Sequence, residues 1–198
     1  IGIVVATLRV ADNRYLRVLG TVYVEFFRNI PLLVHLFFWF FVIPTLLPKD
    51  IRIWWNQLPS CPYWSAVLGV SLYTASRVAE PIRSGIASIP SGQYQAALST
   101  GLTHIQMYRY AILPYAIRVV IPPLTSEFLT IFKNTALAMT INVAETTYTA
   151  RAIETWSFHG LEAYTFASGV YILTTISVVM FMGWLERKIR IPGLIVKK

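Results

Sequence analysis

The stretch SGQYQAALSTGLTHIQMYRYAILP, residues 91–114, lies between apolar segments and is expected to fold as two short helices. Ser91 follows a proline and is placed to cap the first helix, which Gly101 ends. Thr103 and Gln106 form a capping box that starts the second helix. The apolar residues expected to be exposed on this hairpin are Leu98, Leu102, Ile105 and Tyr108. No titratable pair accompanies them, so the stretch predicts a surface that another protein grips.

The composition indicates that this chain is surrounded by lipid and not by water alone. Hydrophobic residues make up 56% of the 198 residues and charged residues 13%, whereas about 25% is usual in soluble domains. A single soluble core of this size would leave large apolar patches exposed. The net charge of +8 does not indicate nucleic acid, because the basic residues lie between apolar segments and form no stripe with aromatic platforms. We expect one transmembrane domain over residues 1–198.

Apolar segments long enough to enter or cross a bilayer recur along the chain. A hydrocarbon core about 30 Å thick needs roughly 20 helical residues. Residues 1–8 are expected to end a first transmembrane helix whose start precedes this sequence, and residues 30–47 to be the first complete crossing. The further apolar segments are residues 63–76, residues 111–132 and the uncharged residues 163–185. Pro122 and Pro123 are expected to kink the second of these or to free carbonyls inside it.

The distribution of basic residues predicts the orientation of these helices. If the first helix runs inward, most arginines and lysines fall on the cytoplasmic side. The basic residues left outside are Lys49, Arg52, Lys133 and Arg151. By the positive-inside rule, the hairpin of residues 91–110 and the C-terminus are then cytoplasmic.

Enzyme signatures are absent from the sequence. It contains no HExxH, GxSxG or Walker-type glycine loop, and its cysteine and histidines (Cys61, His35, His104 and His159) are scattered. We therefore predict no catalytic residue, no metal site and no cofactor bound by this chain. An intramembrane hydrolase would lack a nucleophile and its base. An ion-coupled carrier or channel stays open as an alternative, favoured by the intramembrane Glu127 and Lys133, although it gives no reason for the hairpin.

The hairpin resembles the EAA loop of ABC-importer permeases, which reads E-A-A, three residues, Gly, nine residues, Ile-x-Leu-Pro. Gln95 stands in place of the acidic residue and Ala111 in place of the isoleucine. In that family the loop is a cytoplasmic coupling helix that inserts into a groove of the ATP-hydrolysing subunit. The resemblance implies these ATPase-coupling residues: Gln95, Ala96, Ala97, Gly101, Leu102, Leu113 and Pro114.

Four further stretches resemble polar amino-acid permeases of this family, most closely those for glutamate and aspartate. They are EFFRNIPLLVHLFFWFFVIP (residues 25–44), LYTASRVAEPIRSGIASIPSGQ (72–93), LPYAIRVVIPPLTSEFLTIFKNTAL (113–137) and WLERKIRIPG (184–193). The resemblance implies an all-α membrane protein with the ABC type I importer permease fold and about five transmembrane helices, the first truncated here. It also implies a multi-pass protein of the bacterial inner membrane that moves glutamate or aspartate inward. Its partners would be a sister permease (homo- or heterodimer), ATPase subunits holding ATP and Mg, and an extracytoplasmic solute-binding protein.

Charged residues in the apolar segments are the candidates for a translocation path. A charge at the bilayer centre costs ~2.5–3.5 kcal/mol on insertion scales, so such groups usually face a polar path or a partner. The candidates are Arg77, Glu80, Glu127, Lys133 and Asn134, the last three on one helical face. The guanidinium of Arg77 suits a substrate carboxylate in bidentate fashion. Alternatively, Arg77 snorkels at the cytoplasmic edge or pairs with Glu80 one turn on.

Overall fold

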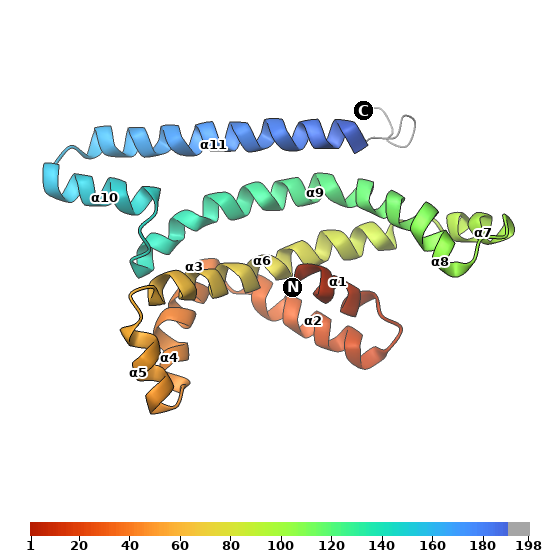
Figure 1. The fold of residues 1–198 in the computed structure, drawn as a ribbon, viewed down its shortest axis with the longest axis horizontal. Helices are drawn as coiled ribbons and strands as arrows, with labels where there is room; N and C mark the ends of the chain where they lie inside the picture. Colours follow the sequence, from red (N-terminus) through yellow and green to blue (C-terminus); the bar gives the residue numbers. More distant parts are fainter. Residues whose placement is uncertain (190–198) are drawn as a thin grey trace.

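The chain is almost entirely helical in the computed structural model, which describes residues 1–189, and this part contains no strand (Figure 1). The helices up to the hairpin are α1 (Gly2–Val10), α2 (Arg14–Asn29), α3 (Leu32–Phe37), η1 (Phe38–Val42), α4 (Ile43–Leu46), α5 (Lys49–Gln57) and α6 (Cys61–Ala87). The remainder are α7 (Ser91–Ser99), α8 (His104–Met107), η2 (Tyr108–Ile112), α9 (Leu113–Asn134), η3 (Thr135–Ile141), α10 (Thr146–Ser157) and α11 (Gly160–Ile189). The predicted all-α fold is confirmed.

Within residues 1–189, two stretches of continuous helix are long and apolar enough to cross a membrane, His104–Ile141 and Gly160–Lys188. They contain the predicted segments 111–132 and 163–185. The 27-residue α6, which contains segment 63–76, is also long enough, although it carries charged residues in its C-terminal half. Figure 1 shows α6, α9 and α11 side by side, with the α7–α8 hairpin at one end and α4, α5 and α10 at the other.

Residues 30–47, predicted as the first complete crossing, are apolar and long enough only together with the helix before them, as a broken span or a re-entrant loop. The helix that leads into this segment is α2, and the chain bends by 100° between Arg14–Asn29 and Leu32–Leu46. Pro31 causes the break, because the residue before a proline is pushed out of helical geometry; Ile30 is extended, with φ −98° and ψ 132°. The part after the bend is only about 22 Å long, too short to cross a bilayer alone.

The two prolines of α9 do not break that helix. Pro122 and Pro123 lie inside a continuous α9, which curves gently past them (Figure 1). Each proline lacks the N–H that would pair with the carbonyl four residues earlier. The two prolines therefore remove helical hydrogen bonds from α9 and accompany its curvature, but they do not kink it sharply.

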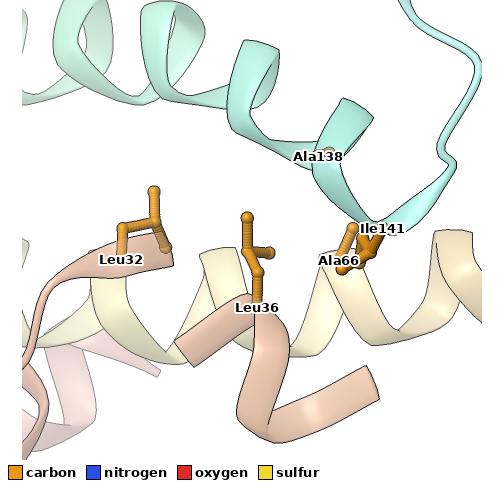
Figure 2. Packing of buried hydrophobic residues seen from close by; sticks show 5 residues of the cluster. All are labelled: Leu32, Leu36, Ala66, Ala138 and Ile141. Atoms are coloured by element: carbon orange, nitrogen blue, oxygen red, sulfur yellow. The ribbon is translucent and has the colours of Figure 1, made fainter. Parts of the chain in front are cut away.

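Helix α6 is the centre of the packing and contacts α1, α2, α3 and α9. One buried cluster joins α3, α6 and η3 (Figure 2) and consists of Leu32, Leu36, Ala66, Ala138 and Ile141. A second joins α1, α2 and α6 through Val5, Ala6, Val24 and Ala79. Many of these residues are small, which lets helices approach closely where lipid offers no hydrophobic driving force. In the most apolar 18-residue stretch of α11, only 6% is buried inside the structure. This helix therefore leaves most of its surface to lipid or to another subunit.

Candidate functional site

The hairpin forms as its local signals predicted, except at its first residue. Gly101 has φ +81°, a left-handed conformation that glycine adopts without strain. The Thr103 hydroxyl accepts a hydrogen bond from the backbone N–H of Gln106 at 3.4 Å. In return, the side-chain oxygen of Gln106 accepts one from the backbone N–H of Thr103 at 2.9 Å. The capping box is thereby confirmed. The prediction for Ser91 was wrong: Pro90 occupies the cap position with no side-chain cap, and Ser91 is already helical.

The coupling residues predicted in the hairpin separate into buried and exposed positions. Ala97 is only 8% exposed and packs with Ile89, Met107 and Ile112 in the core of the hairpin. Leu102, predicted to be exposed, is half-buried against the same core. The exposed coupling residues are Gln95, Ala96, Gly101 and Leu113, and Pro114 is half-buried. The apolar Leu98, Ile105 and Tyr108 are exposed as predicted. A partner can therefore touch Gln95 and Ala96, whereas Ala97 holds the hairpin together.

Aromatic contact ties the two halves of the hairpin together as well. The rings of Tyr94 and Tyr108 lie 6.3 Å apart between centroids in an edge-to-face arrangement. Burial, with a smaller contribution from Tyr108, raises the pKa of the Tyr94 phenol, so Tyr94 stays neutral at physiological pH.

A hollow of about 350 Å³ lies where α2, α6 and α9 meet. Its wall includes two arginines, Arg28 and Arg77, and two glutamates, Glu80 and Glu127. The other lining residues are Ser84, Gly85 and Ser88 in and just after α6, the prolines Pro81 and Pro123, and Val119. Three of the five predicted path residues are thus brought together, and Arg28 joins them from a part of the sequence where no path residue was predicted.

Arg77 crosses from α6 to α9 and forms a bidentate pair with Glu127. Its Nε donates to Oε2 at 2.6 Å and its Nη2 donates to Oε1 at 2.8 Å. The paired-fork geometry gives the strongest type of side-chain ion pair. The two side chains remain 32% and 17% exposed, so the pair is open to the hollow. The alternative in which Arg77 pairs with Glu80 was wrong.

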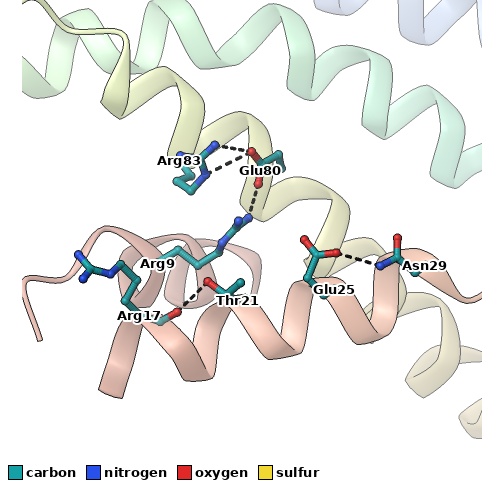
Figure 3. A network of polar contacts seen from close by, with 7 residues as sticks. All are labelled: Arg9, Arg17, Thr21, Glu25, Asn29, Glu80 and Arg83. Carbon is teal, nitrogen blue, oxygen red and sulfur yellow. Dashed lines mark hydrogen bonds and ion pairs between the residues drawn. The ribbon is translucent and has the colours of Figure 1, made fainter. Parts of the chain in front are cut away.

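Glu80 is instead held by two other arginines (Figure 3). Arg83, one turn on, donates to Oε1 from Nη2 at 2.6 Å, and Arg9 of α1 contacts Oε2. Arg9 had not been predicted as a partner. The interaction ties α1 to the C-terminal half of α6, three residues beyond Arg77.

Lys133 and Asn134 do not reach the hollow. Lys133 is exposed near the end of α9 and borders a separate, mostly apolar hollow with Tyr171, Ile172 and Thr175 of α11. Asn134 is the last residue of α9. In residues 1–189, no group of three or more His, Cys, Asp or Glu side chains could hold a metal ion.

Guanidinium groups and backbone carbonyls that lack their helical amide partners surround the hollow. Its wall carries two arginines and two glutamates, and Arg9 and Arg83 add two further guanidinium groups by pairing with Glu80. Pro81 and Pro123 leave the carbonyls of two residues of the wall, Arg77 and Val119, without helical amide partners. Guanidinium groups suit carboxylates, and carbonyls and carboxylates suit an ammonium group.

Helices long and apolar enough to cross a membrane, a hairpin with exposed apolar residues and a charged hollow between helices fit a membrane transport subunit. The chain belongs to the family described as "Binding-protein-dependent transport system inner membrane component", which it matches over residues 1–191. It is therefore an inner-membrane component of such a system, as the sequence resemblance predicted.

Individual relatives support this assignment. The chain is 42% identical over 196 residues to the glutamate/aspartate import permease protein GltJ of Escherichia coli (strain K12), covering 98% of this chain and 80% of that one. It is 33% identical over 189 residues to the probable glutamine ABC transporter permease protein GlnM of Bacillus subtilis (strain 168), with 96% and 83% covered.

Solved structures confirm the predicted fold. One match is the crystal structure of an amino acid ABC transporter with histidines, at a TM-score of 0.78 and 27% identity over 94% of this chain and 83% of that one. The inward-facing MetNI methionine ABC transporter matches at a TM-score of 0.71 and 16% identity over 96% and 84%, which supports the fold alone.

Proposed function

We propose that this chain is the subunit through which a binding-protein-dependent importer moves glutamate or aspartate into the cytoplasm. The observation that carries the substrate class is the bidentate Arg77–Glu127 pair with Arg28 at the wall of the same hollow. The 42% identity to a glutamate/aspartate import permease supports the same class.

The Arg77–Glu127 pair suits selection of an acidic amino acid by exchange of partners. A substrate carboxylate replaces the Glu127 carboxylate on the Arg77 fork, and the freed Glu127 accepts the substrate ammonium. Each charge in the membrane then keeps an opposite partner throughout, which avoids an unpaired charge. Arg28, at the same wall, is available for the second carboxylate. A cationic amino acid would bring a further positive charge beside Arg28 and is disfavoured.

The hairpin connects this site to an energy source. It joins α6, which carries Arg77, directly to α9, which carries Glu127. A force on the hairpin therefore acts on both walls of the hollow. In the proposed mechanism, partner ATPase subunits bind ATP and Mg, close, and move the hairpins of this chain and of a sister permease between outward- and inward-open states.

The remaining parts of the assembly follow from the proposed orientation. With the hairpin and the C-terminus in the cytoplasm, α10 lies at the outer end, on the side from which a solute-binding protein delivers substrate. This chain itself contributes no catalytic residue for ATP hydrolysis.

Uptake by the complete reconstituted transporter tests this function. Proteoliposomes with external glutamate and binding protein, and ATP inside, are expected to accumulate glutamate, with competition by aspartate and none by lysine. Collapsing the ion gradients is expected to leave the rate unchanged. Uptake driven by an ion gradient without ATP would instead establish the carrier alternative, and equal competition by lysine would refute the acidic substrate class.

A further inference from the structure

The bend between α2 and α3 leaves a backbone carbonyl without its helical partner. In a continuing helix, the carbonyl of Phe27 would accept a hydrogen bond from the amide of residue 31. Residue 31 is a proline, which has no N–H, and the chain turns away by 100° at this point. The environment of this carbonyl is part-buried, where an unpaired acceptor is costly, so another donor stabilises it.

His35 supplies that donor. Its Nε2 lies 3.0 Å from the Phe27 oxygen. Because a carbonyl oxygen only accepts hydrogen bonds, Nε2 carries the hydrogen in this contact. The ring is only 2% exposed and is stacked on Phe27 with 5.2 Å between centroids and 22° between planes. His35 therefore closes the end of α2 with both its hydrogen bond and its ring.

The same ring also contacts α6 close to the charged hollow. The ring centroids of His35 and Tyr73 are 5.8 Å apart, and Tyr73 precedes Arg77 by about one helical turn. On its other side, Phe27 directly precedes Arg28 in the sequence. One buried side chain thus lies between the backbone segments that carry the two arginines of the hollow.

We propose that His35 is a positioning residue for transport. By donating to the carbonyl that Pro31 leaves unpaired, it fixes the α2–α3 bend and keeps Arg28 at the wall of the hollow beside Arg77. This inference rests on the proposed function of the hollow. Any side chain of similar reach with an N–H donor should serve equally, and an apolar side chain of similar size should not.

The matched variants are His35→Gln, which keeps a donor, and His35→Leu, which removes it. His159→Leu, at an exposed histidine, controls for loss of an imidazole. Spin labels at Val18 of α2 and Leu46 of α4, both exposed, report on the bend in a Cys61→Ser background. All measurements use the complete transporter in lipid nanodiscs or proteoliposomes.

With His35→Leu, the label distances should broaden and the KM for glutamate should rise about tenfold, with the maximal rate changed by less than about twofold. His35→Gln and His159→Leu should resemble the unchanged protein. Unaltered label distances in His35→Leu would overturn the inference. Broadened distances with an unchanged KM would uphold the role of His35 in the bend and overturn its role in positioning Arg28 for transport, whereas the substrate role of the hollow is tested separately by Arg77→Met.

Discussion

The hairpin and the hollow are held together over different ranges of sequence. In the hairpin, the capping box joins residues three apart, Thr103 and Gln106, and the turn depends on one glycine. In the hollow, Arg77 meets Glu127 across 50 residues and Arg9 meets Glu80 across 71. The hairpin is a self-contained unit presented outward, whereas the hollow exists only once three helices have packed. Substitutions in the hollow should therefore affect both substrate binding and helix packing. Substitutions at the hairpin surface should affect only binding of the partner.

The largest effect is expected from breaking the Arg77–Glu127 pair. Arg77→Met removes the carboxylate-binding fork and leaves Glu127 unpaired, and hydrogen bonds to charged groups contribute about 1.5–3 kcal/mol. Glutamate uptake should fall roughly 100-fold, which corresponds to about 2.7 kcal/mol. Radiolabelled uptake in proteoliposomes measures this.

Two controls distinguish pairing from recognition in this test. Arg77→Lys keeps the charge but loses the planar fork, and should retain an intermediate rate. Exchange of the two residues, Arg77→Glu with Glu127→Arg, should restore thermal stability without restoring glutamate uptake. Wild-type glutamate uptake by Arg77→Met would contradict the substrate role of Arg77.

Neighbouring positions in the hairpin should respond very differently to the same charge. Ala97→Asp places a carboxylate in the hairpin core, at a cost of about 3 kcal/mol, so the hairpin should unfold and become sensitive to protease. Ala96→Asp, at an exposed position, should leave the hairpin protease-resistant and abolish only co-purification of the ATPase subunit and ATP-driven uptake.

Gln95→Glu is the matched control for the hairpin surface. It restores the acidic residue of the motif at an exposed position and should preserve coupling. Normal uptake by Ala96→Asp would exclude this surface as the coupling site.

A smaller effect is expected where α6 meets α9 beside the hollow. A Cβ added at Gly85 would lie 2.2 Å from Val120 Cγ2, so Gly85→Ala forces the two helices apart or the valine into another rotamer. Overpacking of this kind costs about 1–3 kcal/mol, seen as a lower unfolding temperature in detergent. Adding Val120→Ala to Gly85→Ala should recover most of the lost unfolding temperature. Gly92→Ala, with open space at its Cβ, is the control; equal stability of the two alanine variants would refute this close contact.

Features that depend on contacts between residues close in sequence could be predicted, whereas features that depend on contacts between distant residues could not. The capping box, the break at Gly101 and the apolar length of α11 are local properties and could be predicted. The break at Pro31 also had a local signal, the restriction on Ile30, but the apolar content of residues 30–47 was given more weight. The partner of Arg77 could not be deduced, because Glu80 on the same helix and Glu127 on another were equally compatible with the sequence.

Lys133 shows the limit of helical spacing. It shares a face of α9 with Glu127, but it lies about 9 Å further along the axis. At that level α11 lies beside α9, and Lys133 borders a hollow with Tyr171 of α11 instead of the charged hollow. Spacing predicts the face of a helix and not which helix covers each part of that face.

The smallest effect is expected from the capping box itself. Thr103→Ala removes the acceptor for the Gln106 amide and should destabilise the start of α8 by about 1 kcal/mol, with uptake reduced less than about twofold. Hydrogen–deuterium exchange at residues 104–107 should rise in the isolated permease and return to the unchanged level when the ATPase subunit is bound, because a partner that grips the hairpin stabilises its folded form. Exchange that stays raised in the complete transporter would mean that the partner does not contact this part of the hairpin. In that case the hairpin and the hollow would still differ in the range of their contacts. The start of α8 would not be part of the surface that the partner binds.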